Sequence, residues 1–434
     1  MSKQTSVSTS DRTTFDERAL AALPAAPAFV EAIRKQAFEE FRALPIPSQE
    51  TEEWRYTDLS DFDLSFAPHT PGHGAGVPPP VGDHAATLIQ HNSSAVMTTS
   101  GQSDLASRGV VFCDLDLAAV EHPDLVGPHL HGLVPTDRTK FAALHGAFRT
   151  GGTFLYVPAD TAVELPLQTL TWLDADGSAV FPHTLIVAGA GAEVTFIDRF
   201  SSSELSRAFS DAVTEIYVGD GAHVRYVSIQ EWGTGVTHLA VQRTRVGRDA
   251  DFRTLAIGFG ADLSRVEAET VLAEPGGFSE MLGVFFADGS QHFDHRSIQD
   301  HVAPNCTSDL LYKGALRDHS RAVYSGWVHV RKDAQKTVAM QTSRNIVLSE
   351  HAKADAIPNL EIEANDVRCG HAASVGPVDE DTIFYLTSRG IPRAEAERLI
   401  VTGFFQEVLD RVQIEQVRHN AELAILEELG KDVS

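Results

Sequence analysis

The residues best suited to chemistry in this 434-residue chain are Cys369 and His371, within the run EANDVRCGHAASVG. Residues at positions i and i+2 of an extended strand point to the same side, so the thiol and the imidazole are expected to share one face. Both are metal ligands when they are deprotonated. Two ligands do not complete a coordination shell, and the other cysteines, Cys113 and Cys306, form no C-x-x-C motif. A metal site here needs further ligands, most simply from another chain.

A second group of possible ligands lies in the run QHFDHRSIQDH. On a strand His292 and His295 face opposite sides, so they do not converge. The sequence favours a solvated or polar-packed solenoid face over a metal site for His292, Asp294, His295 and His301. Cys306 is expected to be a small core residue.

Carboxylates precede the thiol–imidazole pair, at Glu361, Glu363 and Asp366. Clustered carboxylates in a groove are typical of carbohydrate-active enzymes, which gives one alternative function. The run GAGAEV from Gly189 leads into a strand pattern rather than a helix, and the chain contains no G-x-x-x-x-G-K-[ST] motif. We therefore expect that this chain binds no ATP.

The net charge of −25 and the pI of about 5.1 disfavour nucleic acids and anionic membranes as partners. Three cysteines make no disulfide framework. The first residues, MSKQTSVSTSDRTTFDER, contain no apolar signal segment, and no run of about 18 apolar residues occurs. These features predict a cytoplasmic protein that is not inserted in a membrane.

The pattern along the chain predicts five regions. They are an N-terminal helical region at 1–64, a Pro/Gly-rich linker at 65–84, a mixed α/β region at 85–151, a β-solenoid core at 152–376 and a C-terminal helical domain at 377–434.

A weak repeat supports the solenoid. Turn-plus-strand elements begin at Gly191, Gly221, Asp249, Gly276 and Asn305, about 27 to 30 residues apart, and later ones at His319 and Ala334 follow at about half that spacing, as half-turns would. In a solenoid each turn buries its apolar face against its neighbours. A sandwich or a propeller also produces many short strands, so the repeat alone leaves those folds open.

The C-terminal region contains an apolar stripe at Ile400, Phe404, Val408 and Val412, joined by Leu399, Phe405 and Leu409. The segment Asp379–Ser388 is predicted to form a separate helix, with Pro392 in the first turn of the next one. The stripe favours packing within the chain, on the solenoid or on neighbouring helices, over a partner surface.

The run from about residue 301 to 391, with DHVAPNCTSDLLYKGAL, SRAVYSGWVHV, IPNLEIEANDVRCGHAASVG and IFYLTSRGI, closely resembles the SufB/SufD family of iron–sulfur cluster assembly scaffolds. Within it the chain is similar to SufD members, because TEEWRYTDL at 51–59 matches an N-terminal element of theirs and the length suits them. The resemblance implies a mainly β fold, a right-handed parallel β-helix flanked by helical regions.

The resemblance also implies a non-enzymatic scaffold that pairs with SufB through solenoid edges and holds the ATPase SufC through its C-terminal helices. His371 occupies the position of a family histidine implicated in building a transient iron–sulfur cluster with a SufB cysteine, whereas Cys369 is either a ligand or structural. Many members read C-S-H-G-A-T, where this chain has Cys369, Gly370, His371 and then Ala372, Ala373 and Ser374. This departure bears on the backbone geometry around the imidazole.

In such a system sulfur arrives from a cysteine desulfurase and its carrier. The sequence leaves open whether a reduced flavin joins the complex and whether the chain also forms a homodimer. A purely architectural interaction solenoid remains the second alternative function.

Overall fold

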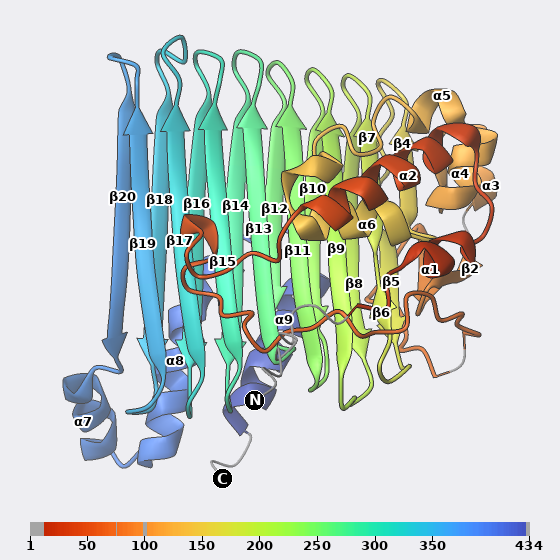
Figure 1. Cartoon of the computed structure of the whole chain (residues 1–434). Coiled ribbons are helices and arrows are strands. Elements are labelled where there is room, and N and C mark those ends of the chain that lie inside the picture. The colour runs from red at the N-terminus through yellow and green to blue at the C-terminus, as the bar shows by residue number, and fades with distance from the viewer. Residues whose placement is uncertain (1–12, 75, 99–101, 431–434) are drawn as a thin grey trace, which may run out of the picture.

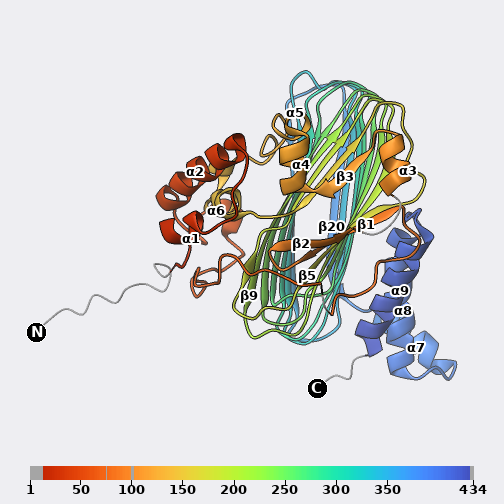
Figure 2. The ribbon, with the colours of Figure 1, turned by 90° about the vertical axis from the view of Figure 1, so that its right-hand side faces the viewer.

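The computed structural model describes residues 13–74, 76–98 and 102–430. The first 12 residues, on which the expectation of no signal segment rests, and residues 431–434, within the predicted C-terminal domain, lie outside these ranges. Two long sheets face each other, and helices cover their outer faces (Figures 1 and 2).

The first sheet has the strand order β2-β1-β5-β8-β10-β12-β14-β16-β18-β20. Its strands are β2 (Ser94–Thr98), β1 (Ala86–His91), β5 (Leu167–Leu173), β8 (Glu193–Ser202), β10 (His223–Glu231), β12 (Asp251–Gly258), β14 (Phe278–Ala287), β16 (Thr307–Leu316), β18 (Val338–Val347) and β20 (Arg368–Pro377). All neighbours pair in parallel except β1 with β2.

The second sheet has the order β19-β17-β15-β13-β11-β9-β7-β4-β3, with β6 also paired to β9. Its strands are β19 (Lys353–Ile362), β17 (Arg321–Val330), β15 (His292–His301), β13 (Leu263–Leu272), β11 (Val236–Val246), β9 (Ala208–Val218), β7 (His183–Ala188), β6 (Ala179–Val180), β4 (Thr153–Val157) and β3 (Val111–Asp114). From β7 to β20, long strands that follow each other in the chain alternate between the sheets, so the predicted parallel β-solenoid is confirmed.

The repeat found in the sequence marks one column of stacked turns. Residues with positive φ recur there every 27 to 31 positions, at Asp160, Gly191, Gly221, Asp249, Gly276, Asn305 and Lys336. Each donates its backbone N–H to a carbonyl in the following turn, for example Gly221 to Arg248 at 2.8 Å. Glycine, Asn and Asp tolerate this left-handed conformation best, which explains the residue types in the repeat.

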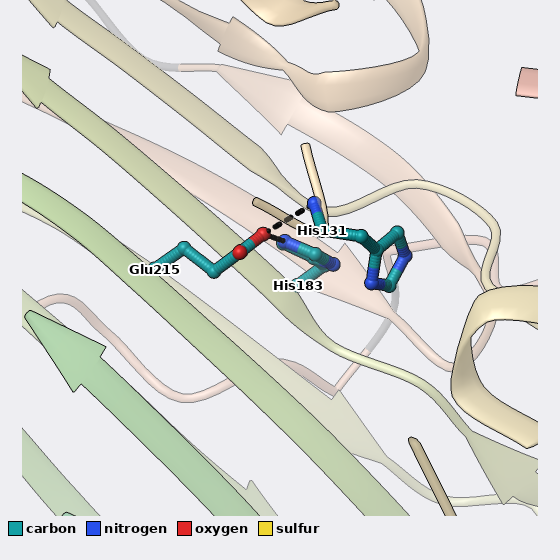
Figure 3. A group of neighbouring side chains, drawn as sticks. All are labelled: His131, His183 and Glu215. Atoms are coloured by element: carbon teal, nitrogen blue, oxygen red, sulfur yellow. Dashed lines mark hydrogen bonds and ion pairs between the residues drawn. The ribbon is translucent and has the colours of Figure 1, made fainter. Parts of the chain in front are cut away.

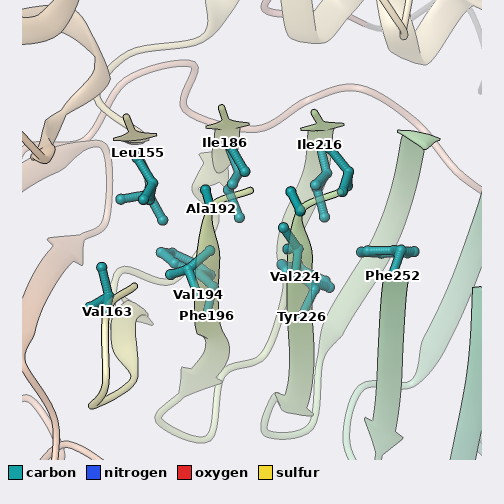
Figure 4. Packing of buried hydrophobic residues seen from close by; sticks show 14 of the residues in the cluster. Leu155, Val163, Ile186, Ala192, Val194, Phe196, Ile216, Val224, Tyr226 and Phe252 are labelled. Atoms are coloured by element: carbon teal, nitrogen blue, oxygen red, sulfur yellow. The ribbon is translucent and has the colours of Figure 1, made fainter. Parts of the chain in front are cut away.

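The interior is filled by side chains stacked in register (Figure 4). Val194, Val224 and Phe252 occupy paired positions on β8, β10 and β12, while Leu155 and Ile186 form a facing row on β4 and β7. All five are at most 2% exposed. Each turn therefore buries its apolar side chains against the turns before and after it.

The N-terminal helices cover the outer face of the second sheet. They include α1 (Glu17–Ala21), α2 (Ala28–Ala43) and the 3-10 turn η2 (Glu52–Trp54), which pack with α6 (Lys140–Phe148) and the 3-10 turn η3 (Thr136–Arg138). The run TEEWRYTDL docks here, with the Arg265 guanidinium 4.0 Å from the Trp54 ring and Thr57 Oγ1 donating to Asp294 at 2.5 Å. This element thus fixes the helical layer to the solenoid.

The Pro/Gly-rich segment 65–84 contains no helix and no named strand among its described residues. Phe66 and Val81 in it are buried, and the Val81 N–H donates to Gln168 Oε1 at 2.9 Å. The segment is therefore held against the solenoid at several points.

The mixed region contains β1 to β3 and the helices α3 (Gln102–Ser107), α4 (Leu115–Glu121) and α5 (Pro123–Val126). These elements gather at the end of the solenoid where β3 and β4 lie (Figure 2). The α4 helix begins after Asp114, whose side chain accepts from the Leu117 N–H at 2.9 Å.

The C-terminal helices α7 (Glu380–Ser388), α8 (Arg393–Leu409) and α9 (Glu415–Gly430) lie beside the first sheet (Figure 2). Most of the stripe packs inside the chain, because Phe405, Val408 and Leu409 form one cluster with Leu255 and Leu282 of the sheet, whereas Leu399 is exposed. Within the described part of the chain, no helix is long and apolar enough to cross a membrane.

Candidate functional site

The two ends of the solenoid differ in whether their last strands are paired on both sides. At one end β1 and β4 each pair with an antiparallel strand, β2 and β3, and helices lie nearby. At the other end β20 pairs only with β18, and β19 pairs only with β17, among the described residues. Backbone groups of two parallel edge strands are therefore free to pair with another chain at this open end.

Cys369 and His371 lie on β20, at the open end. They are register partners of Ala339 and Gln341, which are fully buried on β18 and face the solenoid interior. Because pairing in register preserves the face, the thiol and the imidazole share the interior-facing side, as the spacing predicted. His371 is exposed and Cys369 is half-buried, since no further turn covers them.

Partial burial raises the pKa of the Cys369 thiol, and a hydrogen bond from the Ala339 backbone opposes this shift. The thiol is therefore protonated near neutral pH and must lose its proton before it binds a metal. Its side chain also packs at the rim of an apolar cluster that contains Val328, Val330 and Ala339.

A row of polar side chains lies beneath this pair inside the solenoid. Gln341 Nε2 donates to Gln299 Oε1 at 3.4 Å, Gln299 Nε2 donates to Ser308 Oγ at 2.7 Å, and His301 Nε2 lies 2.8 Å from the same hydroxyl. Gln341 Oε1 and His301 Nδ1 are buried without a hydrogen-bond partner among the described residues. The interior next to His371 is thus polar.

The second group of sequence candidates does not converge. Asp294 lies on the outer face, where it accepts from Arg265 at 2.6 Å, whereas His295 and His301 are buried and burial lowers the pKa of each to about 4. His292 and His295 face opposite sides of the strand, as their spacing predicts, and the His295 ring packs against Phe285 and Tyr312. Cys306 is fully buried, as expected for a core residue.

His131, His183 and Glu215 form a cluster that the sequence did not predict, with His183 and Glu215 fully buried (Figure 3). Glu215 accepts from the backbone N–H groups of His131 and Leu133, both at 2.7 Å, and of Val134 at 2.9 Å, and it lies 3.1 Å from His183 Nε2. His131 lies in a loop, His183 on β7 and Glu215 on β9, so no local sequence motif predicts that they meet.

A fourth side chain fixes the protonation of this cluster. His145 Nδ1 must donate to the Asp211 carbonyl at 2.9 Å, so its Nε2 accepts from His183 Nδ1 at 3.1 Å. His183 Nε2 then faces Glu215, and the two share one proton. Burial lowers the pKa of His183 and raises that of Glu215, which favours the neutral pair. Both Glu215 oxygens already accept backbone hydrogen bonds, so the cluster suits packing rather than metal binding.

Comparisons with known proteins place these features in one family. A model of the SufBD core domain, described as SUF system FeS cluster assembly, matches residues 171–404, and a model of the SufBD N-terminal region matches residues 81–169. The iron–sulfur cluster assembly protein SufD of Bacillus subtilis is 32% identical over 405 residues, covering 90% of this chain and 92% of that protein. A SufBD family protein of Mycobacterium tuberculosis is 35% identical over 349 residues, covering 78% and 84% respectively.

Proposed function

This chain belongs to the SufB/SufD family of iron–sulfur cluster assembly proteins, and on that premise we propose that it is a SufD-like scaffold subunit. In this proposal it pairs with SufB through the open end of its solenoid and holds the ATPase SufC through its C-terminal helices. It carries no catalytic residue of its own, and the family is one of assembly proteins rather than of carbohydrate-active enzymes.

The observation that carries the proposal is the position of His371 on a free edge strand. Edge pairing by β20 or β19 with a second solenoid would satisfy their unpaired backbone groups and bring a partner's side chains next to His371. A coordination shell that neither chain can complete alone would then form only in the complex.

His371 would supply a neutral imidazole nitrogen to the nascent cluster, which is the cargo of the system, and a SufB cysteine would supply a thiolate. Cys369 is less suited to be a permanent ligand, because its thiol is protonated near neutral pH and packs at the edge of an apolar cluster. We therefore assign the principal ligand role to His371.

The C-terminal helices offer a surface for SufC. Several large apolar side chains on them are exposed in this chain, namely Phe384, Tyr385, Leu399, Leu423 and Leu426. Exposed apolar groups of this kind suit a protein interface. ATP would act through SufC, and sulfur would come from a cysteine desulfurase and its carrier.

The proposal is tested by co-expressing the chain with SufB and SufC, purifying the complex without oxygen, and measuring bound iron and sulfide. We expect His371→Ala to retain the complex and to lose most of its iron and sulfide. His223→Ala is the matched control, since His223 is also an exposed histidine on a strand of the first sheet, β10, away from the open end.

An intact His371→Ala complex with unchanged iron and sulfide would overturn the ligand role and leave an architectural subunit. Failure of the wild-type chain to co-purify with SufB would overturn the proposed partnership itself.

A further inference from the structure

A second set of metal-ligand residues lies at the open end, on the outer face of the second sheet. His329 on β17 and Glu361 on β19 are direct register partners. Glu363 follows β19 and donates its N–H to the Val330 carbonyl at 2.8 Å, which extends the pairing by one residue. Positions 361 and 363 therefore share a face with His329.

The ligand atoms of these residues converge. One atom each from His329, Glu361 and Glu363 lies within 4.8 Å of the other two. One imidazole and two carboxylates form a ligand set that suits first-row divalent cations such as iron(II), manganese(II) and zinc(II). The His329 side chain is 27% exposed and the two glutamates are exposed, so a cation and its remaining waters have access.

The imidazole is backed by a buried carboxylate. Asp300 Oδ1 lies 3.5 Å from His329 Nδ1, and the Asp300 side chain is only 5% exposed. Arg331 holds this carboxylate with two contacts of 3.0 and 2.6 Å. A carboxylate next to one ring nitrogen favours a proton there and leaves the other nitrogen as a ligand, the arrangement that commonly supports metal-bound histidine.

The charges around the site are not balanced by protein groups. Among the described residues, no lysine or arginine lies within ion-pair distance of Glu361 or Glu363. The nearby Arg331 contacts Asp300 and interacts with Glu363 only at longer range. Three carboxylates, Asp300, Glu361 and Glu363, against one guanidinium leave two negative charges. A divalent cation would neutralise them and relieve the repulsion between the two glutamates.

We propose that His329, Glu361 and Glu363 form a binding site for a divalent first-row cation, with Asp300 positioning the imidazole. That iron(II) is its natural occupant rests on the proposed function, because iron is a substrate of cluster assembly. The site is separate from His371. It lies on the outer face of the second sheet, whereas His371 faces the interior from the first, and the loop 363–367 joins the strands that carry them.

The test uses the isolated full-length chain without partners, so that its outcome does not depend on SufB or on cluster formation. Anaerobic titration with iron(II), and with cobalt(II) as an optical probe, should give one binding event per chain. We expect His329→Asn, and the double variant Glu361→Gln/Glu363→Gln, each to weaken this event at least about tenfold.

Two controls locate the site. Glu350→Gln/His351→Asn removes an exposed carboxylate and an exposed imidazole in the turn between β18 and β19, and it should leave binding unchanged. His223→Ala, at an exposed histidine on β10 away from the open end, should also leave it unchanged. Absence of binding by the wild-type chain, binding by the His329 and glutamate variants as tight as by the wild type, or loss of binding in His223→Ala would each overturn the proposal.

Discussion

The two ends of the solenoid use similar residues in opposite ways. At the covered end, His131, His183 and Glu215 are enclosed, and backbone N–H groups take up both oxygens of the carboxylate. At the open end, His371, Glu361 and Glu363 are exposed and His329 is partly exposed. The same side chains therefore stabilise the fold in one place and are available for ligands in the other.

The difference follows from what covers each end. The antiparallel strands β2 and β3 complete the first turns, and helices cover the outer face of the second sheet beside them, so polar groups there must find partners within the chain. After β20 the chain leaves the solenoid for α7, and the last turn is left uncovered. Side chains that can bind a metal remain accessible at this end because no further solenoid turn packs on β19 and β20.

Glu215→Ala is the strongest test of this comparison. The substitution leaves three N–H groups, one buried and two partly buried, without their acceptor and removes the partner of His183. A hydrogen-bond donor left without an acceptor inside the protein costs about 1 to 3 kcal/mol, so we expect the free energy of unfolding to fall by about 3 kcal/mol or more, measured by chemical denaturation. Glu193→Ala is the control, because Glu193 is exposed at the start of β8, and its effect should stay within about 0.5 kcal/mol.

If Glu215→Ala and Glu193→Ala lowered the free energy of unfolding equally, the His131, His183 and Glu215 cluster would not stabilise the fold. The proposed difference between the two ends would then be wrong.

The effect of Gly326→Ala on the free energy of unfolding measures how tightly the interior is packed near the open end. A Cβ at Gly326 on β17 would lie 2.4 Å from Gln341 Nε2 and 2.5 Å from the Tyr324 hydroxyl, and both residues are fully buried. Overpacking of this kind costs about 1 to 3 kcal/mol, which thermal or chemical unfolding would measure. Gly376→Ala on β20 is the matched control, because a Cβ there meets no atom within 4 Å. A neutral Gly326→Ala would mean that the polar row under His371 is loosely packed.

Much of the fold could be predicted from the sequence because a solenoid is built from local rules. The turn residues at Gly191, Gly221, Asp249, Gly276 and Asn305 all have positive φ, and the strands after them pair in one sheet. Alternation along a strand placed Cys369 and His371 on one face, as the register confirms. Their role as cluster ligands remains a prediction.

Contacts between distant segments could not be predicted. His131, His183 and Glu215 meet only because a loop, β7 and β9 come together, and His329 joins Glu361 through a register that no local pattern contains. The apolar stripe of the last region was placed correctly within the chain. The side chains that are most deeply buried in α8 include Val401 and Phe405, while Ile400 and Phe404 are partly exposed. The face that a helix buries depends on the sheet beneath it.

The smallest predicted effect concerns the pH response of the covered end. Burial holds the pKa of His145 well below its usual value, so the folded chain keeps this imidazole neutral while the unfolded chain protonates it near pH 6.5. Its contribution to stability is therefore present above about pH 6.5 and is lost as the pH falls below it. In His145→Gln this proton uptake is absent. The difference in unfolding free energy between the wild type and the variant should thus shrink by about 1 kcal/mol between pH 7.5 and 5.5. If this difference in unfolding free energy stayed constant between about pH 7.5 and 5.5, the folded chain would protonate His145 as readily as the unfolded chain does. The cluster at the covered end would then be open to water, as His371 is at the open end.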